Sequence, residues 1–133
     1  CIALCTLDQG FLDARTPRLD FQRGYCSFCD ACADVCPTGA IASGFEEDVE
    51  KIGVAVVDEA RCLAFNGGGC ERCADSCPYD AVDFSKTYPV VDADSCNGCG
   101  MCTYVCPSNS LRSFTGSRDT RGINVVVESE VRT

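Results

Sequence analysis

Short runs of aliphatic residues alternate with longer polar loops along this chain. The valine-rich runs at 54–57 and 90–91 are typical of short β-strands. They belong to a repeated frame, VVDEARC at 56–62 and VVDADSC at 90–96, in which two valines and an aspartate precede a cysteine. No apolar run approaches the ~20 residues that a membrane-spanning helix needs, so we expect no membrane span.

A longer repeat is built on the cysteines. Three segments share one frame and end in an aliphatic residue: CDACADVCPTGAI (29–41), CERCADSCPYDAV (70–82) and CGMCTYVCPSNSL (99–111). Together with the valine runs, this frame predicts a unit of a short strand, a cysteine loop, a half-turn of helix and a second short strand at Ile41, Val82 or Leu111. Two such units would pack as a βαββαβ module.

The repeats divide the chain into two modules and a tail. The first module, residues 1–45, is incomplete at its start, and the second covers residues 54–114. The acidic segment at 42–53 is the expected linker between them. Residues 115–133 form a loosely ordered tail that is either a terminal strand or a docking segment.

Cysteine dominates the composition, with 14 among 133 residues. Hydrophobic residues make up 46% of the chain, but only about 35% when cysteine is left out, below the usual ~45–50%. The cysteines must therefore supply structure as disulfides, zinc thiolates or iron–sulfur clusters. The absence of His excludes Ser-His-Asp and Cys-His catalysis. A net charge of -9 argues against nucleic acid as a partner.

Two cysteine runs read C-x2-C-x2-C-x3-C-P, at 26–37 and 96–107. This is the run of bacterial ferredoxins, in which the fourth cysteine ligates the other cluster of a pair. A third run, at 70–78, has its first cysteine displaced to Cys62, across the loop LAFNGGG, whose glycines let it fold back. The sequence therefore predicts an α+β fold of tandem bacterial-ferredoxin-like βαββαβ modules, with small strands and short helices around the clusters.

The first two cysteines fit the same run only in part. Cys1-x3-Cys5 matches its third and fourth positions, although Thr6 stands where the other runs have proline. We therefore expect the chain to begin in the middle of a motif and to be an N-terminally truncated piece, with two more cysteines upstream.

Pairing the first motif with the second and the third with the fourth assigns the iron ligands. The cofactor-binding cysteines then fall into four sets: Cys62, Cys70, Cys73 and Cys106; Cys96, Cys99, Cys102 and Cys77; Cys26, Cys29, Cys32 and Cys5; and Cys1 with Cys36. Each of the first three sets would hold one [4Fe-4S] cluster completely. The fourth set is an incomplete site, whose cluster is expected in the full-length protein.

Disulfides and zinc fit these spacings less well. Neighbouring cysteines on one tight loop cannot all find partners at the separation that a disulfide needs. Four-cysteine zinc sites usually show two separated C-x2-C pairs, whereas the pairs here are fused into triplets with a fourth cysteine and a proline. The spacing favours iron–sulfur clusters.

The stretches YCSFCDACADVCP, CLAFNGGGCERCADSCPYDAV and SCNGCGMCTYVCP resemble the NapF family of ferredoxin-type accessory proteins of periplasmic nitrate reductase systems. The displaced cysteine, C-x7-C-x2-C-x3-C, is the most specific element of a resemblance that covers about residues 1–114. It implies a cytoplasmic protein with [4Fe-4S] clusters. It also implies contact with the catalytic molybdoenzyme subunit before export, as an electron donor or a maturation factor.

Two functional classes stay open, electron transfer between redox partner proteins and maturation of a nitrate reductase catalytic subunit. The alternative is an electron-transfer subunit, or a fragment, of another multi-cluster oxidoreductase complex. No substrate-pocket signature is present, so we do not expect an enzyme. The acidity either directs docking onto basic patches of partners or confers solubility. Phe28, Phe65 and Tyr104 lie within cysteine loops, where we expect them to shield clusters from water.

Overall fold

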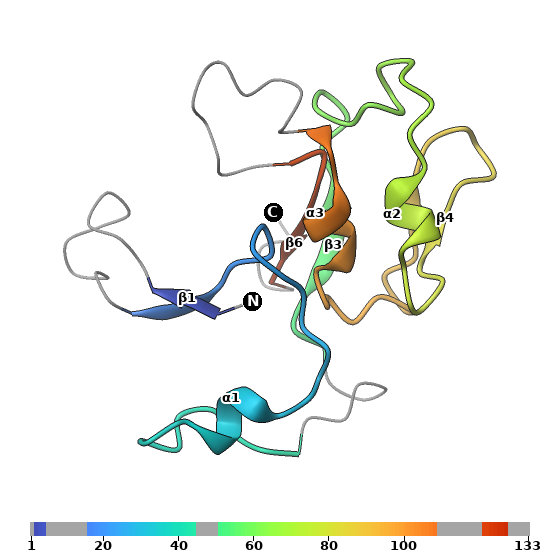
Figure 1. Ribbon diagram of the computed structural model, residues 1–133. Helices are drawn as coiled ribbons and strands as arrows, with labels where there is room; N and C mark the ends of the chain where they lie inside the picture. Colours follow the sequence, from blue (N-terminus) through green and yellow to red (C-terminus); the bar gives the residue numbers. More distant parts are fainter. Residues whose placement is uncertain (1, 5–15, 45–50, 109–120, 128–133) are drawn as a thin grey trace.

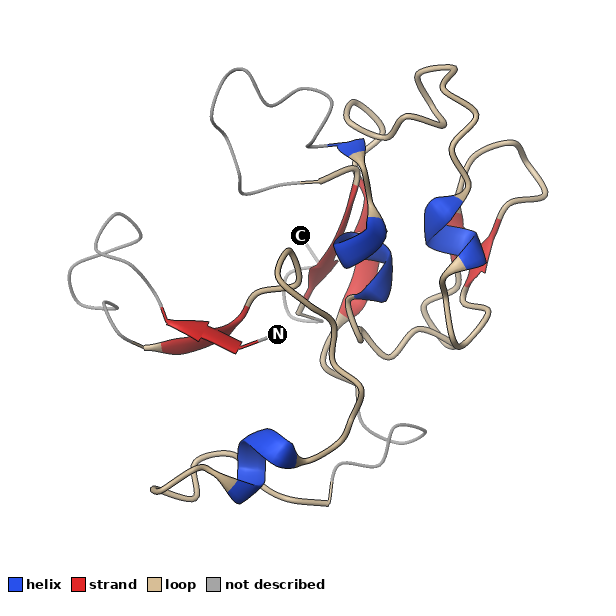
Figure 2. Ribbon diagram, viewed as in Figure 1, coloured by secondary structure: helices blue, strands red, loops and turns tan. Residues whose placement is uncertain are grey.

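The computed structural model describes residues 2–4, 16–44, 51–108 and 121–127 (Figures 1 and 2). In chain order, the described residues form β1 (Ile2–Leu4), β2 (Pro17–Leu19), α1 (Ala31–Asp34), β3 (Val54–Val57), α2 (Arg72–Asp75), β4 (Val82–Asp83), β5 (Val90–Val91), α3 (Met101–Val105) and β6 (Ile123–Val126). Every element is short, as expected for an α+β chain whose cysteine loops separate brief aliphatic runs. None of the helices in these ranges is long and apolar enough to cross a membrane.

The segment from β3 to β6 runs strand, helix, strand, strand, helix, strand. β3 pairs antiparallel with β6, with Val54 opposite Val126, and β4 pairs antiparallel with β5, with Val82 opposite Val91. The first strand of the segment thus pairs with the last, and the two middle strands pair with each other. Helices α2 and α3 contact each other, and α3 lies along the β3–β6 pair while α2 lies beside β4 (Figure 1).

Both valine runs form strands, as the sequence predicts, at β3 and β5. The aliphatic residue that ends the second repeat begins β4. β6 lies within residues 115–133, so the part of the expected tail at 123–126 is a strand paired with the module. The strand expected at Leu111 lies outside the described residues.

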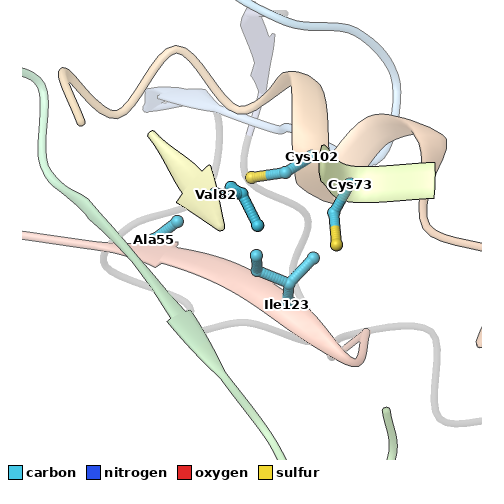
Figure 3. Close-up of a cluster of buried hydrophobic side chains, with 5 residues drawn as sticks. All are labelled: Ala55, Cys73, Val82, Cys102 and Ile123. Carbon is cyan, nitrogen blue, oxygen red and sulfur yellow. The ribbon is translucent and has the colours of Figure 1, made fainter. Parts of the chain in front are cut away.

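The hydrophobic core between these elements is small. Ala55 of β3, Val82 of β4 and Ile123 of β6 pack with two cysteines, Cys73 of α2 and Cys102 of α3 (Figure 3). Among the described residues, no large side chain is fully buried. The shortage of ordinary apolar residues is therefore matched by a core in which thiols take their place.

The N-terminal residues depart from the expected module. β1 pairs with β2 and α1 follows, but the strand expected at Ile41 is not formed, and residues 36–44 are irregular loop with short turns and bends. Gly39 and Gly44 have left-handed backbone, with φ of 66° and 87°, which interrupts an extended chain. The Gly44 amide also donates a hydrogen bond of 2.8 Å to the Asp30 carboxylate, which folds this loop back toward α1.

Contacts near α3 join the N-terminal residues to the rest. The Cys26 amide donates to the Cys99 carbonyl at 2.7 Å, and the Ile52 amide donates to the Asn97 carbonyl at 2.9 Å. The rings of Tyr25 and Tyr104 also contact each other, with centroids 6.0 Å apart. The N-terminal cysteine loop is thereby attached beside the last one.

Candidate metal centres

Four cysteines from separate parts of the chain line one small cavity between α2 and the segment that follows α3. We call this set site A: Cys62, Cys70, Cys73 and Cys106. Cys62 and Cys73 are buried, with 9% and 8% of their surface exposed, and the other two are half-buried. Site A therefore combines cysteines of two different runs.

The glycine-rich loop brings the displaced Cys62 to site A. The side-chain amide of Asn66 donates to the Cys62 carbonyl at 2.7 Å, and the Gly68 amide donates back to the Leu63 carbonyl at 2.7 Å. Gly67 has a φ of 77°, a conformation that glycine adopts without steric cost. The loop closes on itself, so the seven residues between Cys62 and the next cysteine do not separate the two in space.

A second set of cysteines lines another small cavity, next to β3 and α3. We call this set site B: Cys77, Cys96, Cys99 and Cys102. Backbone amides contact two of its sulfurs, since Ala55 N–H lies 3.5 Å from Cys96 Sγ and Ala81 N–H lies 3.4 Å from Cys77 Sγ. Hydrogen bonds of this kind stabilise the charged form of the sulfur.

Each set takes one cysteine from the other run. α2 ends at Asp75, and the turn that follows carries Cys77 to site B. α3 ends at Val105, and the extended backbone of Cys106, with a ψ of 121°, leads to site A. The structure thus brings together the two sets that the pairing of motifs predicts for the C-terminal module, and cluster binding by them stays a prediction.

Burial makes these thiols resist ionisation. It raises the pKa of Cys73 to about 11 and that of Cys102 to about 12, and it also raises the pKa of Cys99. Negative charge on the other cysteines of the same set raises each pKa further, and Cys73 adds to the effect on Cys102 across the boundary between the sites. Four thiolates at either site therefore need several positive charges beside them, which a multi-iron cluster supplies.

The state of the described cysteines bears on which form of cysteine chemistry they support. All twelve cysteines within the described ranges are free thiols, so no disulfide joins any two of them. In those same ranges, no group of three or more Cys, Asp or Glu is arranged to hold a single metal ion. Four free thiols at each cavity are the donor set of a [4Fe-4S] cluster, so the residues present fit that group.

The N-terminal run gathers three cysteines and separates the fourth. A cavity of about 590 Å³ is lined by the set that we call set C: Cys26, Cys29 and Cys32. Cys36 is not among the lining residues. Its sulfur lies 3.5 Å from the Thr38 hydroxyl, and this hydrogen bond is the main reason why the Cys36 pKa falls to about 7. Cys1 and Cys5, expected to complete the N-terminal sites, lie outside the described residues.

The aromatic residues of the cysteine loops have partners of their own. The Phe65 ring lies against Tyr88, with centroids 4.6 Å apart, and Phe28 lines the cavity of set C. Tyr104 is exposed and contacts Tyr25. A shielding role for these rings stays a prediction.

Comparison with known proteins agrees with this geometry. Two family models, each described as a 4Fe-4S dicluster domain, match residues 55–112 and 25–81. Ferredoxin-type protein NapF of Escherichia coli (strain K12) is 34% identical over 100 residues, which cover 71% of this chain and 59% of NapF. The chain belongs to the NapF-like ferredoxin-type family. The first family match contains all of site A and site B, and the second contains set C.

Other relatives of this ferredoxin-type chain extend the comparison. Ferredoxin-type protein NapG of Escherichia coli (strain K12) is 35% identical over 122 residues, 79% of this chain and 52% of NapG. The thiosulfate reductase electron transfer subunit PhsB of Salmonella typhi is 33% identical over 104 residues, 69% of this chain and 47% of PhsB. The ferredoxin-type chain thus spans about half to three-fifths of the length of these relatives.

Sequence reasoning does not identify two residues of this ferredoxin-type chain that lie beside site A. The Ser108 hydroxyl lies 3.3 Å from Cys106 Sγ. Arg121 binds carbonyl groups at the end of α3. A signal exists for Ser108, because it follows a Cys-Pro pair just as Thr38 follows Cys36. Arg121 comes from the expected tail, and nothing in its sequence context points to site A.

Proposed function

We propose that this ferredoxin-type chain binds [4Fe-4S] clusters at sites A and B and carries single electrons between partner proteins, with no catalysis of its own. The observation that carries the proposal is the convergence of eight free cysteines into two sets of four, each containing one cysteine of the other run. A bound cluster supplies one-electron redox chemistry. The chain supplies ligation, burial and hydrogen bonds to sulfur, which set the reduction potential.

Anaerobic reconstitution with iron and sulfide tests cluster binding. We expect sites A and B to take up about eight iron atoms together, four for each cluster, with the visible absorption and reduced-state EPR spectrum of [4Fe-4S] clusters. A colourless protein that holds stoichiometric zinc would end this proposal.

Pairs of cysteine substitutions test which residues share a cluster. Cys106→Ala and Cys70→Ala should each cost about four irons, and the double variant should cost no more, because both residues belong to site A. Cys106→Ala combined with Cys99→Ala should cost about eight irons. The matched control is Cys36→Ala, which removes the fourth cysteine of the N-terminal run and leaves sites A and B intact. If the Cys106/Cys70 double variant instead lost about eight irons and the Cys106/Cys99 double variant only about four, each run would keep its own fourth cysteine. That result would refute the assignment of Cys106 to site A.

We also propose a third cluster at set C, with Cys5 as its fourth ligand. Support comes from the three thiols that line one cavity and from the exclusion of Cys36 from it. The wild type should then hold about four irons more than sites A and B alone, and Cys29→Ala should lose these four. Cys36→Ala should not affect this cluster. Loss of the same cluster in both variants would assign Cys36 to set C in place of Cys5.

The proposed partner is the catalytic subunit of a periplasmic nitrate reductase, met in the cytoplasm before export. Similarity to NapF and NapG supports this partner. An electron carrier should be reoxidised rapidly by the mature enzyme, at a rate that falls with salt if the net charge of -9 directs docking. A maturation factor should bind the precursor and react slowly with the mature form. Export of a reporter fused to the full-length protein would contradict the cytoplasmic location.

Similarity to PhsB favours a second candidate, an electron-transfer subunit of another reductase complex. Copurification separates the two candidates. A stable complex with a different oxidoreductase catalytic subunit, and no reaction with nitrate reductase in either form, would support the second.

A further inference from the structure

Ser108 is a buried hydroxyl beside a sulfur of site A. Only 3% of its surface is exposed, and its Oγ lies 3.3 Å from Cys106 Sγ. The same Oγ accepts a hydrogen bond of 2.6 Å from the Gly122 amide. Ser108 therefore connects the sulfur of Cys106 to the backbone of the strand segment at 121–127.

The direction of the hydrogen bond at the sulfur follows from this second contact. The Gly122 amide can only donate, so it uses an acceptor site of Ser108 Oγ and leaves the hydroxyl proton available. A cysteine sulfur that ligates iron has lost its proton and can only accept. In a loaded site A, the proton between the two atoms must therefore come from Ser108.

Arg121 holds this arrangement in place. Its Nη1 donates to the carbonyls of Thr103, Tyr104 and Cys106, at 2.9, 2.7 and 2.8 Å. These bonds fix the residue before Gly122 to the end of α3, so the amide that orients Ser108 moves together with Cys106. A charged donor on these carbonyls is a strong restraint, which holds the Gly122 amide close to the end of α3 and to Ser108.

We propose that Ser108 donates a hydrogen bond to the Cys106 sulfur when site A holds its cluster and thereby raises the reduction potential of that cluster. Reduction adds negative charge that spreads onto the ligand sulfurs, so a donor stabilises the reduced form more than the oxidised form. Burial strengthens the effect, because no water replaces a donor that is lost. The proposal rests on the proposed function, in that site A must bind a [4Fe-4S] cluster.

A redox titration of the full chain, followed by EPR, tests the proposal with Ser108→Ala. The signal of site A is the one that Cys70→Ala removes. At a fixed potential near the midpoint, the ratio of reduced to oxidised site A should fall about tenfold in Ser108→Ala, which corresponds to about 59 mV for a one-electron couple. Ser108→Thr, which keeps the hydroxyl, should retain the wild-type potential, and the potential of site B should not change in either variant.

Thr38→Val is the matched control. It removes the same kind of hydroxyl from beside Cys36, where the contact is exposed and lies outside site A, so the potential of site A should stay constant. Ser108→Cys keeps the shape of the side chain but donates more weakly, and it serves as a second variant if Ser108→Ala does not load.

The outcomes separate this proposal from the one on which it rests. If wild-type protein shows no signal that Cys70→Ala removes, then cluster binding at site A is refuted. If the wild type loads and the potential of site A is unchanged in Ser108→Ala or Ser108→Cys, then the role of Ser108 is refuted. If neither variant holds a cluster at site A while Ser108→Thr does, Ser108 acts in assembly, and the tuning role is also refuted.

Discussion

Replacement of Ile123 tests whether the segment after residue 120 belongs to the core. Ile123 is 2% exposed and packs against Cys73 of site A and Cys102 of site B (Figure 3). Ile123→Ala removes three buried carbons, a loss of about 2.4 kcal/mol at ~0.8 kcal/mol each, and the cavity left behind brings the total cost to about 2–5 kcal/mol. Because small domains are stabilised by only ~5–15 kcal/mol, this is a large fraction. Ile123→Val should cost about 0.5–1.5 kcal/mol.

The assay is anaerobic denaturation by urea of the cluster-loaded protein, followed through the visible absorption of the clusters and through circular dichroism. Val127→Ala is the matched control, because Val127 follows the same strand but is 50% exposed, so its replacement should change stability by less than about 0.5 kcal/mol. The reasoning would be refuted by equal midpoints for Ile123→Ala and Val127→Ala, since residues 123–126 would then not complete the core.

Three further changes probe site A and its surroundings. In Gly122→Ala, the new Cβ would lie 2.9 Å from Cys62 Cα and 3.1 Å from its backbone nitrogen, so Cys62 must shift. We expect this variant to lose about four irons, from site A alone. A full iron complement would contradict the close packing of Gly122 against Cys62. Arg121→Met removes three hydrogen bonds to carbonyl groups and should lower the free energy of unfolding by about 1.5–3 kcal/mol, whereas an unchanged urea midpoint would show that the contacts are not maintained. Since burial raises the pKa of Cys73 to about 11 and of Cys102 to about 12, both carry a proton at neutral pH without metal, and ligation must displace it. Loading should therefore strengthen as the pH rises from 6 to 9, by up to about tenfold per pH unit for each proton released, and iron titrations with a midpoint independent of pH would contradict this linkage.

The parts of the fold that the sequence predicts are those encoded by local spacing. The cysteine runs specify tight loops and short helices within about ten residues, and the run at 54–57 needs no distant information to be recognised as a strand. The glycines after Cys62 likewise predict a loop that folds back on itself. The contacts that orient Ser108 and hold Arg121 join residues 14 to 18 positions apart in the chain, so local spacing does not predict them.

The missing strand at Ile41 shows why a repeated frame does not guarantee a repeated fold. Val82 occupies the same position of the frame and forms β4, because the next valine run, at Val90–Val91, is free to pair with it. The valine run that follows Ile41 is β3, and β3 pairs with β6 instead. No strand in the described part of the chain pairs with the segment after α1, and this segment takes the turns that Gly39 and Gly44 permit. A strand is thus specified by its partner as much as by its own residues.

Contacts between residues far apart in the chain also bring the three cysteine sets close to one another. Cys99 of site B has Cys26 of set C among its charged neighbours, and Cys102 of the same site has Cys73 of site A among its own. Site B therefore has a neighbouring cysteine in each of the other two sets. The hydrogen bond from the Cys26 amide to the Cys99 carbonyl, 2.7 Å long, connects set C to site B directly through the backbone. In the proposed role as an electron carrier, this hydrogen bond would connect set C to site B, and the contact between Cys73 and Cys102 would connect site B to site A.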